Sequence, residues 1–290
     1  MDPAHLVKLL ISGSILLLVM SLGMRATFAD ATSLLRHAFE KPHRLLRALV
    51  AMYVVVPTFA MAMSLSFDLA TPVQVGLLAM AIAPIPPILP GKQMKTGSSP
   101  GQVFGLLVAV SLCSVLLVPL MVEVLERVFG RESSFGPAQV ARTIALTILI
   151  PLGAGLLLRA VWPRAAAVLA PWASRLGTLM LAAGVIAVLV KAWPAMHTLI
   201  VQGEPVAVMA VLGCLAIAAG HGLGGPAPSD RADLAIASAM RHPGIAIAVA
   251  TSNAPEEPLL AAAILLYVLV AAVLTSVYVA LVTRRRATPG

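Results

Sequence analysis

Apolar residues form long stretches along this chain, and short polar or proline-rich segments separate them. A run of about 20 apolar residues is long enough to cross the hydrocarbon core of a bilayer as a helix. The period-two alternation of an outer-membrane barrel strand does not occur in these runs. The pattern predicts nine helical spans, at about 4–24, 45–65, 72–97, 102–125, 138–158, 172–190, 205–223, 231–253 and 258–283.

Two of the predicted spans are interrupted by proline. Residues 83–92 contain four prolines, Pro84 and Pro90 among them, and residues 241–244 read Arg-His-Pro-Gly. Proline has no backbone donor and clashes with the carbonyl four residues earlier, so neither stretch can continue as a regular helix. Unwound backbone at membrane depth survives where it is buried in protein or lines a wet cavity. Broken helices of this kind are typical of substrate or ion sites in transporters.

Composition supports the membrane assignment and excludes several other classes. The 290 residues are 60% hydrophobic and 11% charged, and the mean hydropathy is +0.97. A soluble domain of this length could not cover so much apolar surface. We therefore expect one transmembrane domain over 1–290, embedded in the lipid bilayer. Cys113 and Cys214 lie inside apolar runs without metal-ligand spacing, so we interpret them as packing residues.

Basic residues set the expected orientation. With the N-terminus outside, segments on the inner side carry about 12 Lys and Arg, whereas outer segments carry about 5. This bias predicts an external N-terminus and a cytoplasmic C-terminus in the inner cell membrane. It also explains the net charge of +8 without a nucleic acid partner. An alternative for the N-terminus is a signal peptide cleaved near Ala29-Asp30-Ala31, but Asp2 and Arg25 favour a first span.

The interruptions fall at matching places in the two halves of this topology. The third of the first four spans is broken, and so is the third of the last four. The two sets begin on opposite sides of the membrane, which is the layout of secondary transporters built from inverted repeats. We predict an all-α membrane protein of nine transmembrane helices, with an inverted repeat and two discontinuous helices that cross.

The second interruption carries the most unusual charge in the chain. Arg241 lies near the middle of its span, where an arginine costs about 2.5–3.5 kcal/mol to insert. One interpretation is that its guanidinium binds an anion. The other is that it satisfies carbonyls freed by Pro243 or pairs with an acid. For His242, a satisfied hydrogen-bond donor and a proton carrier are both open interpretations.

The first interruption adds a second cation. Lys92 follows Pro90-Gly91, and half-helix N-termini near Gly91 and Gly244 would present free amides to an anion. No His-Glu-x-x-His, Gly-x-Ser-x-Gly or paired buried aspartates occur, so we expect no catalytic residues, no metal ligands and no cofactor. The candidate substrate- or ion-binding residues are Pro84, Pro90, Gly91, Lys92, Ser238, Arg241, His242, Pro243, Gly244 and Asn253.

Taken in order along the chain, the sequence motifs resemble those of the bile acid:sodium symporter family. The early spans and their loop are similar at Leu22-Gly23-Met24, Asp30, Leu34-Leu35-Arg36-His37 and Pro57. The breaks are similar at Pro84 and at Met240 and Gly244. The chain resembles the family's nine-helix form, which lacks the first of ten helices. The resemblance implies a panel of about 1–25 and 138–190, a core of about 45–125 and 205–283, and substrate bound between them near the crossing.

The chain departs from the family where sodium would bind. The Ser-Asn at the family's first break corresponds to Leu89 and Pro90. The Glu and Gln-Asn of its second break correspond to Ala237, Arg241 and His242. Hydroxyls expected on the following helix correspond to Val103 and Leu107. Sodium prefers several oxygens with a carboxylate, so the fold is carried over and the sodium sites are not.

These departures lead to a hypothesis about function. Arg241, with Lys92 or His242, would occupy the space in which family members bind sodium ions. The chain would then transport an organic anion, bile-acid-like or another carboxylate, by alternating access. His242 would offer coupling to protons. One alternative is a conventional sodium symporter that uses carbonyls at 84–89 with Ser238 or Asn253. A second alternative is a membrane receptor that does not transport.

Overall fold

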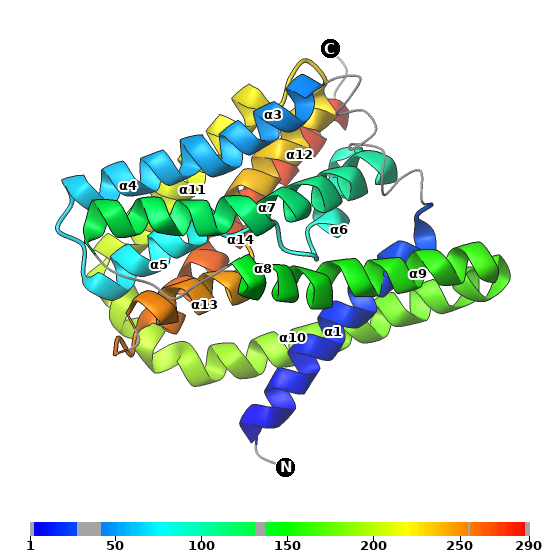
Figure 1. Ribbon diagram of the computed structural model, residues 1–290, viewed down its shortest axis with the longest axis horizontal. Coiled ribbons are helices and arrows are strands. Elements are labelled where there is room, and N and C mark those ends of the chain that lie inside the picture. The colour runs from blue at the N-terminus through cyan, green and yellow to red at the C-terminus, as the bar shows by residue number, and fades with distance from the viewer. Residues whose placement is uncertain (1–2, 28–41, 131–136, 255, 288–290) are drawn as a thin grey trace.

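The computed structural model describes residues 3–27, 42–130, 137–254 and 256–287, and every regular element in these ranges is a helix (Figure 1). The loop at 28–41, with Asp30, Leu34–His37 and the alternative cleavage site, lies outside the described residues. The elements are α1 (Pro3–Arg25), α3 (Pro42–Val50), η1 (Ala51–Val55), α4 (Val56–Ser66), α5 (Thr71–Ile82), α6 (Pro90–Gln93), η2 (Met94–Thr96), α7 (Pro100–Phe129), α8 (Pro137–Ile144), η3 (Ala145–Leu149), α9 (Ile150–Val161), α10 (Pro163–Gln202), α11 (Glu204–Leu223), α12 (Pro228–Ala239), α13 (Pro243–Asn253) and α14 (Leu260–Ala287).

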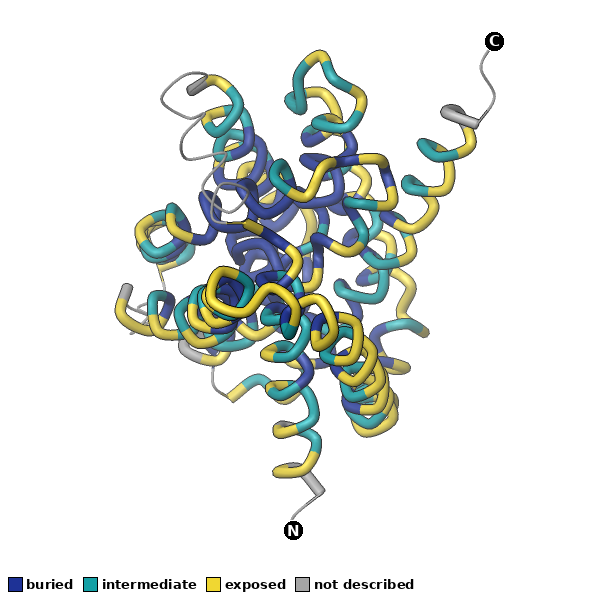
Figure 2. The backbone as a smooth tube through the Cα atoms, turned by 90° about the vertical axis from the view of Figure 1, so that its right-hand side faces the viewer, coloured by how far each residue is buried: buried dark blue, intermediate teal, exposed yellow. Residues whose placement is uncertain are grey.

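Among the described residues, eight helices are long and apolar enough to cross a bilayer. The shorter apolar helix Thr71–Ile82 belongs to the first broken segment. Large apolar side chains cover much of the outer surface, and the buried residues gather at the centre (Figure 2). Contact of such an apolar surface with lipid is favourable, whereas its contact with water is not. The chain is therefore a multi-pass membrane protein.

Both predicted interruptions are confirmed. Helix α5 ends at Ile82, and residues 83–86 have no regular structure before a turn leads into α6. Helix α12 ends at Ala239, and α13 begins at Pro243 after the extended residues Met240 and His242. Proline at the start of a helix costs no hydrogen bond, because the first amides have no intrahelical acceptor.

The expected half-helix after the first interruption is wrong. Only one α-helical turn, α6, and one 3₁₀ turn, η2, follow the proline-rich stretch. Gly97 then adopts a φ of 80°, which ends the turn. The Ser99 side chain accepts a hydrogen bond from the Gln102 amide and starts α7. Gly91 is therefore an exposed residue in a single helical turn and does not lie at the start of a long helix.

Helix α10 is much longer than the predicted span at 172–190. It runs for 40 residues and contains Pro171 and Pro194 in its interior. Trp172 and Trp193 consequently lie inside the helix and not at its ends. Lipid offers no alternative partner for backbone groups, so continuing the helix past a proline costs less than ending it there.

The helices fall into two packing groups. Helix α1 packs against α9 and α10, and a small apolar cluster around Ala166 lies between them. A second small cluster, around Val19 and Leu152, also includes two residues of α7. The main core joins α3 to α7 with α11 to α14 and also includes residues of α8, η3 and the end of α10. In Figure 1, α1, α9 and α10 lie together below this larger group. The broken segments, α5–α6 and α12–α13, both belong to the larger group.

Glycine allows α1 and α9 to approach closely. A Cβ added at Gly23 would lie 2.4 Å from the Leu152 carbonyl oxygen, and one at Gly155 would lie 2.2 Å from the Met20 carbonyl oxygen. Small residues let membrane helices gain van der Waals contact where no hydrophobic driving force exists. The neighbouring Gly153 has nothing within 4 Å of such a Cβ.

We predict that Gly155→Ala lowers the free energy of unfolding by about 1–3 kcal/mol, because the new methyl group meets fixed backbone. Gly153→Ala is the matched control on the same helix. It should raise stability by up to about 1 kcal/mol, since alanine favours helix. Chemical unfolding of both variants in detergent measures the difference. Equal stabilities would contradict the close contact.

Candidate functional site

The two interrupted segments meet through their backbones. The His242 amide donates a hydrogen bond of 2.8 Å to the Pro84 carbonyl oxygen. We call this place, where residues 83–86 and 240–242 touch, the junction. It lies at the centre of the larger helix group, and His242 and Arg241 are both buried there.

The Arg241 guanidinium ties three elements together at the junction. The side chain is 2% exposed. Its Nε donates to the Ser238 carbonyl at 3.0 Å, its Nη1 to the Ala83 carbonyl at 3.2 Å and its Nη2 to the Met52 carbonyl at 2.8 Å. The acceptors belong to α12, the end of α5 and the π-helical turn η1.

Each of these carbonyls has lost the amide that would pair with it in a helix. The partner of the Ala83 carbonyl would be residue 87, which is proline. The partner of the Ser238 carbonyl would be the His242 amide, which bonds to Pro84 instead.

The third carbonyl is freed by a π-helical turn. The Val56 amide would pair with Met52 in an α-helix but donates to Ala51. The next residue, Pro57, has no amide proton to offer. Arg241 thus satisfies oxygens that proline leaves unpaired, which agrees with the second interpretation of its role.

Two tyrosines complete the surroundings of the guanidinium. The Tyr267 hydroxyl of α14 donates to the Ala239 carbonyl at 3.3 Å, whose helical partner would be Pro243. The Tyr53 ring centroid lies 6.0 Å from Arg241 Cζ, within reach of a cation–π contact. Within the described part of the chain, no carboxylate pairs with Arg241. The junction therefore carries a buried positive charge without an acidic neighbour.

His242 caps the helix that follows the break. Its Nδ1 accepts a hydrogen bond of 3.3 Å from the Ile245 amide. The neutral ring must then carry its proton on Nε2. That atom is buried and has no hydrogen-bond partner in the described structure, and neither has Ser238 Oγ. Two orphaned polar atoms thus lie on the same interrupted segment as Arg241.

Lys92 is not brought to the junction. Its Nζ donates to the Ala272 carbonyl at 3.2 Å, to Thr275 Oγ1 at 2.6 Å and to Ser276 Oγ at 3.0 Å. All three hydrogen bonds of the Lys92 ammonium group therefore connect α6 to α14. Asn253 ends α13, and its side chain lies outside the described residues.

An open cavity of about 850 Å³ lies between α1, α10 and α14. Its only charged lining residue is Lys191, which is exposed on α10. On α14, Leu265 lines this cavity, whereas Tyr267, about 200° further round the helix, reaches the junction. Helix α14 thus stands between the two. The lining residues are Val7, Ala187, Val188, Val190, Lys191, Ala192, Ala195, Pro258, Ala261, Ala262 and Leu265.

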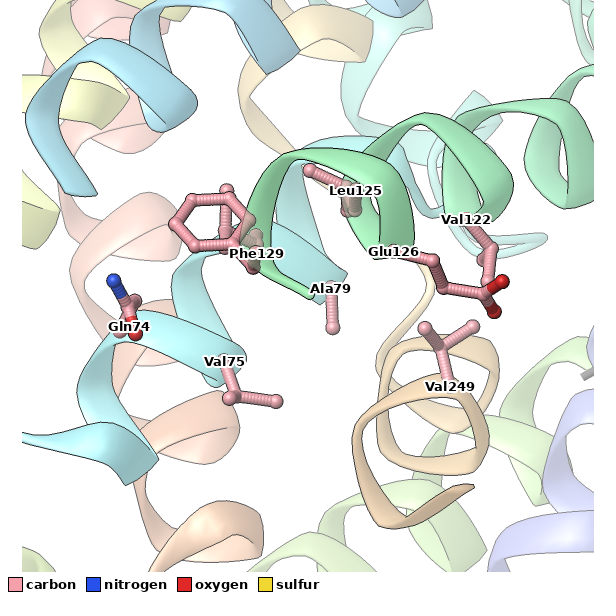
Figure 3. Close-up of a pocket in the computed structure, with 9 residues that line it drawn as sticks. Gln74, Val75, Ala79, Val122, Leu125, Glu126, Phe129 and Val249 are labelled. Carbon is pink, nitrogen blue, oxygen red and sulfur yellow. The ribbon is translucent and has the colours of Figure 1, made fainter. Parts of the chain in front are cut away.

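A second and much smaller cavity, of about 40 Å³, lies between α5, α7 and α13 (Figure 3). It is mostly apolar, and Glu126 extends from α7 toward Val249 of α13. The carboxylate would repel an anion here. Of the two cavities, the one with Lys191 therefore suits an anionic ligand.

Sequence reasoning missed several of these residues. Met52, Tyr53 and Tyr267 surround the guanidinium but lie in ordinary apolar runs. The signal for Met52 was Pro57, since a proline within a helix frees a carbonyl in the preceding turn. The candidate residues predicted from the sequence included neither Lys191 nor Glu126.

Comparison with known protein families shows to which family the chain belongs. A search of curated proteins gave no match. The sequence model of the sodium bile acid symporter family matches residues 14–197, which is more than half of the chain and includes the first interruption. Members of this family are membrane transporters and not enzymes. Together with the apolar helices, this match shows that the chain belongs to the sodium bile acid symporter family.

Proposed function

We propose that the protein is a secondary active transporter of an organic anion that works by alternating access. The buried Arg241 guanidinium, without an acidic neighbour at the junction of the two interrupted segments, carries this proposal. Its field attracts a negative charge and disfavours a second cation. Interrupted helices that meet in the membrane are the usual location of a transport site.

The donor set at the junction does not fit sodium. A hard cation needs several free oxygens, usually with carboxylates. The Met52, Ala83 and Ser238 carbonyls already accept hydrogen bonds from Arg241. No group of three or more His, Cys, Asp or Glu side chains within the described ranges could hold a metal ion. We infer that the guanidinium is a permanent cation in place of a transported one.

The cavity beside α14 supports an anion with an apolar body, such as a bile-acid-like or other large carboxylate. Its walls are apolar, and Lys191 is the one cation among its lining residues. A ligand site of this type combines apolar walls with a few polar groups that fix orientation. We propose that α1 and α8–α10 act as the panel, that α3–α7 and α11–α14 act as the core, and that the anion binds between them.

The proposed topology has nine spans, with α5 and α6 forming the discontinuous third span of an inverted repeat. We put the N-terminus outside and the C-terminus in the cytoplasm of the inner membrane. The basic residues Arg44, Arg47 and Arg231 support this orientation, because α3, the start of α12 and the end of α14 lie at one end of the molecule (Figure 1).

We expect anion uptake into proteoliposomes that does not depend on sodium. Uptake would be compared with sodium, potassium or a proton gradient imposed. Equal rates in sodium and potassium support the built-in cation, and stimulation by an inward proton gradient would assign coupling to His242. A steep dependence on sodium alone would favour the conventional symporter. Saturable binding without flux would favour the receptor.

Substitution of Arg241 should affect stability as well as transport. Arg241→Gln leaves buried carbonyls unpaired, so we expect the free energy of unfolding to fall by about 3–5 kcal/mol. Arg142→Gln, an exposed arginine on α8, is the control and should change it by less than about 0.5 kcal/mol. In Arg241→Glu, a carboxylate replaces the cation, so uptake should become sodium-dependent. Wild-type stability in Arg241→Gln would contradict the three hydrogen bonds.

Lys191 should determine affinity for the anion. We predict that Lys191→Gln raises the KM for uptake about tenfold with little change in kcat, because a charge-assisted contact to the carboxylate is lost. Arg175→Gln on the same helix is the control, since Arg175 is exposed and does not line the cavity. Initial uptake rates over a range of anion concentrations measure both constants. An unchanged KM would exclude this cavity as the binding site.

A further inference from the structure

A cleft lined by Arg44 and Arg47 lies where α3, the end of α11 and the start of α12 meet, at one end of the molecule and away from the junction. Figure 1 shows these three elements at that end. Two adjoining cavities, of about 60 and 200 Å³, make up this cleft. Both are lined by Arg44, Arg47, Gly224 and Asp230. His43 lines the second cavity as well. The transport mechanism proposed above uses none of these residues.

Both carboxylates that line the cleft have hydrogen-bond partners, and one of them is paired with a cation. Arg44 forms an ion pair and hydrogen bond with Asp230 Oδ2, and Gln102 Nε2 donates to Asp230 Oδ1 at 2.8 Å. Asp233, which lines the first cavity, accepts a hydrogen bond from Ser98 Oγ. Each of the two carboxylates thus has a partner of its own.

Arg47 is the cation that remains. It is half-buried, and no hydrogen bond or ion pair joins it to any described residue. Its guanidinium keeps five donors, in a planar fork that matches the oxygens of a phosphate. Arg47 lies three residues after Arg44 on α3, so both side chains project to one face of the helix. The cleft therefore presents a free guanidinium beside a paired one.

The turn opposite Arg47 is shaped to leave it room. Gly225 has a φ of 96°, a conformation that other residues rarely adopt. A Cβ at Gly225 would lie 3.0 Å from Arg47 Nη1. Arg231 Nε donates to the Gly225 carbonyl at 2.6 Å and holds the turn in place. The cleft is thus built from a fixed turn on one side and α3 on the other.

From the position of α3, we expect the cleft to lie at the membrane surface. It is the polar first part of a membrane span that runs from His43 to Ser66. Leu46, on the other side of α3 from Arg44 and Arg47, is 60% exposed and suits contact with lipid. A helix with basic and apolar faces at such a position lies among lipid headgroups.

We propose that this cleft binds a phosphate group through Arg47, and that the phosphate belongs to the headgroup of an anionic phospholipid. Basic pockets between membrane helices recognise such headgroups by charge and by bidentate arginine contacts. Soluble phosphate shares this chemistry and is the other source. The inference is independent of the transported substrate and of the coupling ion.

The test uses the full chain purified in detergent and its thermal unfolding. Dioleoylphosphatidylglycerol, dioleoylphosphatidylcholine and inorganic phosphate are titrated separately against the wild type, Arg47→Gln, Arg47→Lys and Arg142→Gln. We expect phosphatidylglycerol to raise the unfolding temperature of the wild type more than phosphatidylcholine does. Arg47→Gln should weaken the apparent affinity for phosphatidylglycerol about tenfold or more. Arg47→Lys should retain part of the affinity, and Arg142→Gln all of it.

The outcomes distinguish a lipid headgroup from soluble phosphate as the ligand, and they can also contradict the proposed phosphate site. A loss in Arg47→Gln that is specific to phosphatidylglycerol supports the headgroup. An equal shift with inorganic phosphate, also lost in Arg47→Gln, supports the phosphate site but overturns lipid as its source. Equal phosphatidylglycerol affinity in the wild type and Arg47→Gln overturns the site. Because Arg47 has no hydrogen-bond or ion-pair partner among the described residues, Arg47→Gln should unfold at the wild-type temperature without lipid.

Discussion

Unpaired backbone carbonyls at membrane depth are the constraint on which this structure depends. Every proline inside an apolar span removes an amide that a carbonyl in the preceding turn would need, and lipid supplies no replacement. Three carbonyls are in this position, at Met52, Ala83 and Ser238, and the Arg241 guanidinium pairs with all of them. A single side chain with five donors can connect elements that no backbone hydrogen bond joins.

The hydrogen bonds that stabilise the junction come from a charged side chain, so they also bring a positive charge into the protein interior. A neutral donor could satisfy one of these carbonyls, as the Tyr267 hydroxyl does for Ala239. Arginine satisfies three but brings a full charge into a buried place, and the described residues provide no acid to balance it. Carbonyl dipoles and the Tyr53 ring stabilise that charge in part. The remaining field is the physical reason to expect an anion close to the junction, since in low dielectric a charge acts over a long range.

Much of the fold could be predicted from the sequence, and the site only in part. Long apolar runs and clustered prolines are local signals, so the helical spans and both interruptions were predictable. The length of α10 was not, because Pro171 and Pro194 end a helix in water but not in lipid. Lys92 illustrates the limit for the site. Its neighbours along the chain placed it beside the first break, but its partners are on α14, 180 or more residues away.

The tethered guanidinium also bears on which surfaces can move. Separating α5 from α12 would break the Arg241 and His242 hydrogen bonds together, and each broken bond would leave an unpaired group in a dry interior. The group of α1, α9 and α10 has one small apolar cluster of its own and shares another with α7. The large cavity lies between α1 and α10 on one side and α14 on the other. Sliding along that boundary exchanges apolar contacts for apolar contacts and costs no buried hydrogen bond at the junction. The alternating access that we propose should therefore move the junction as one rigid unit against α1, α9 and α10.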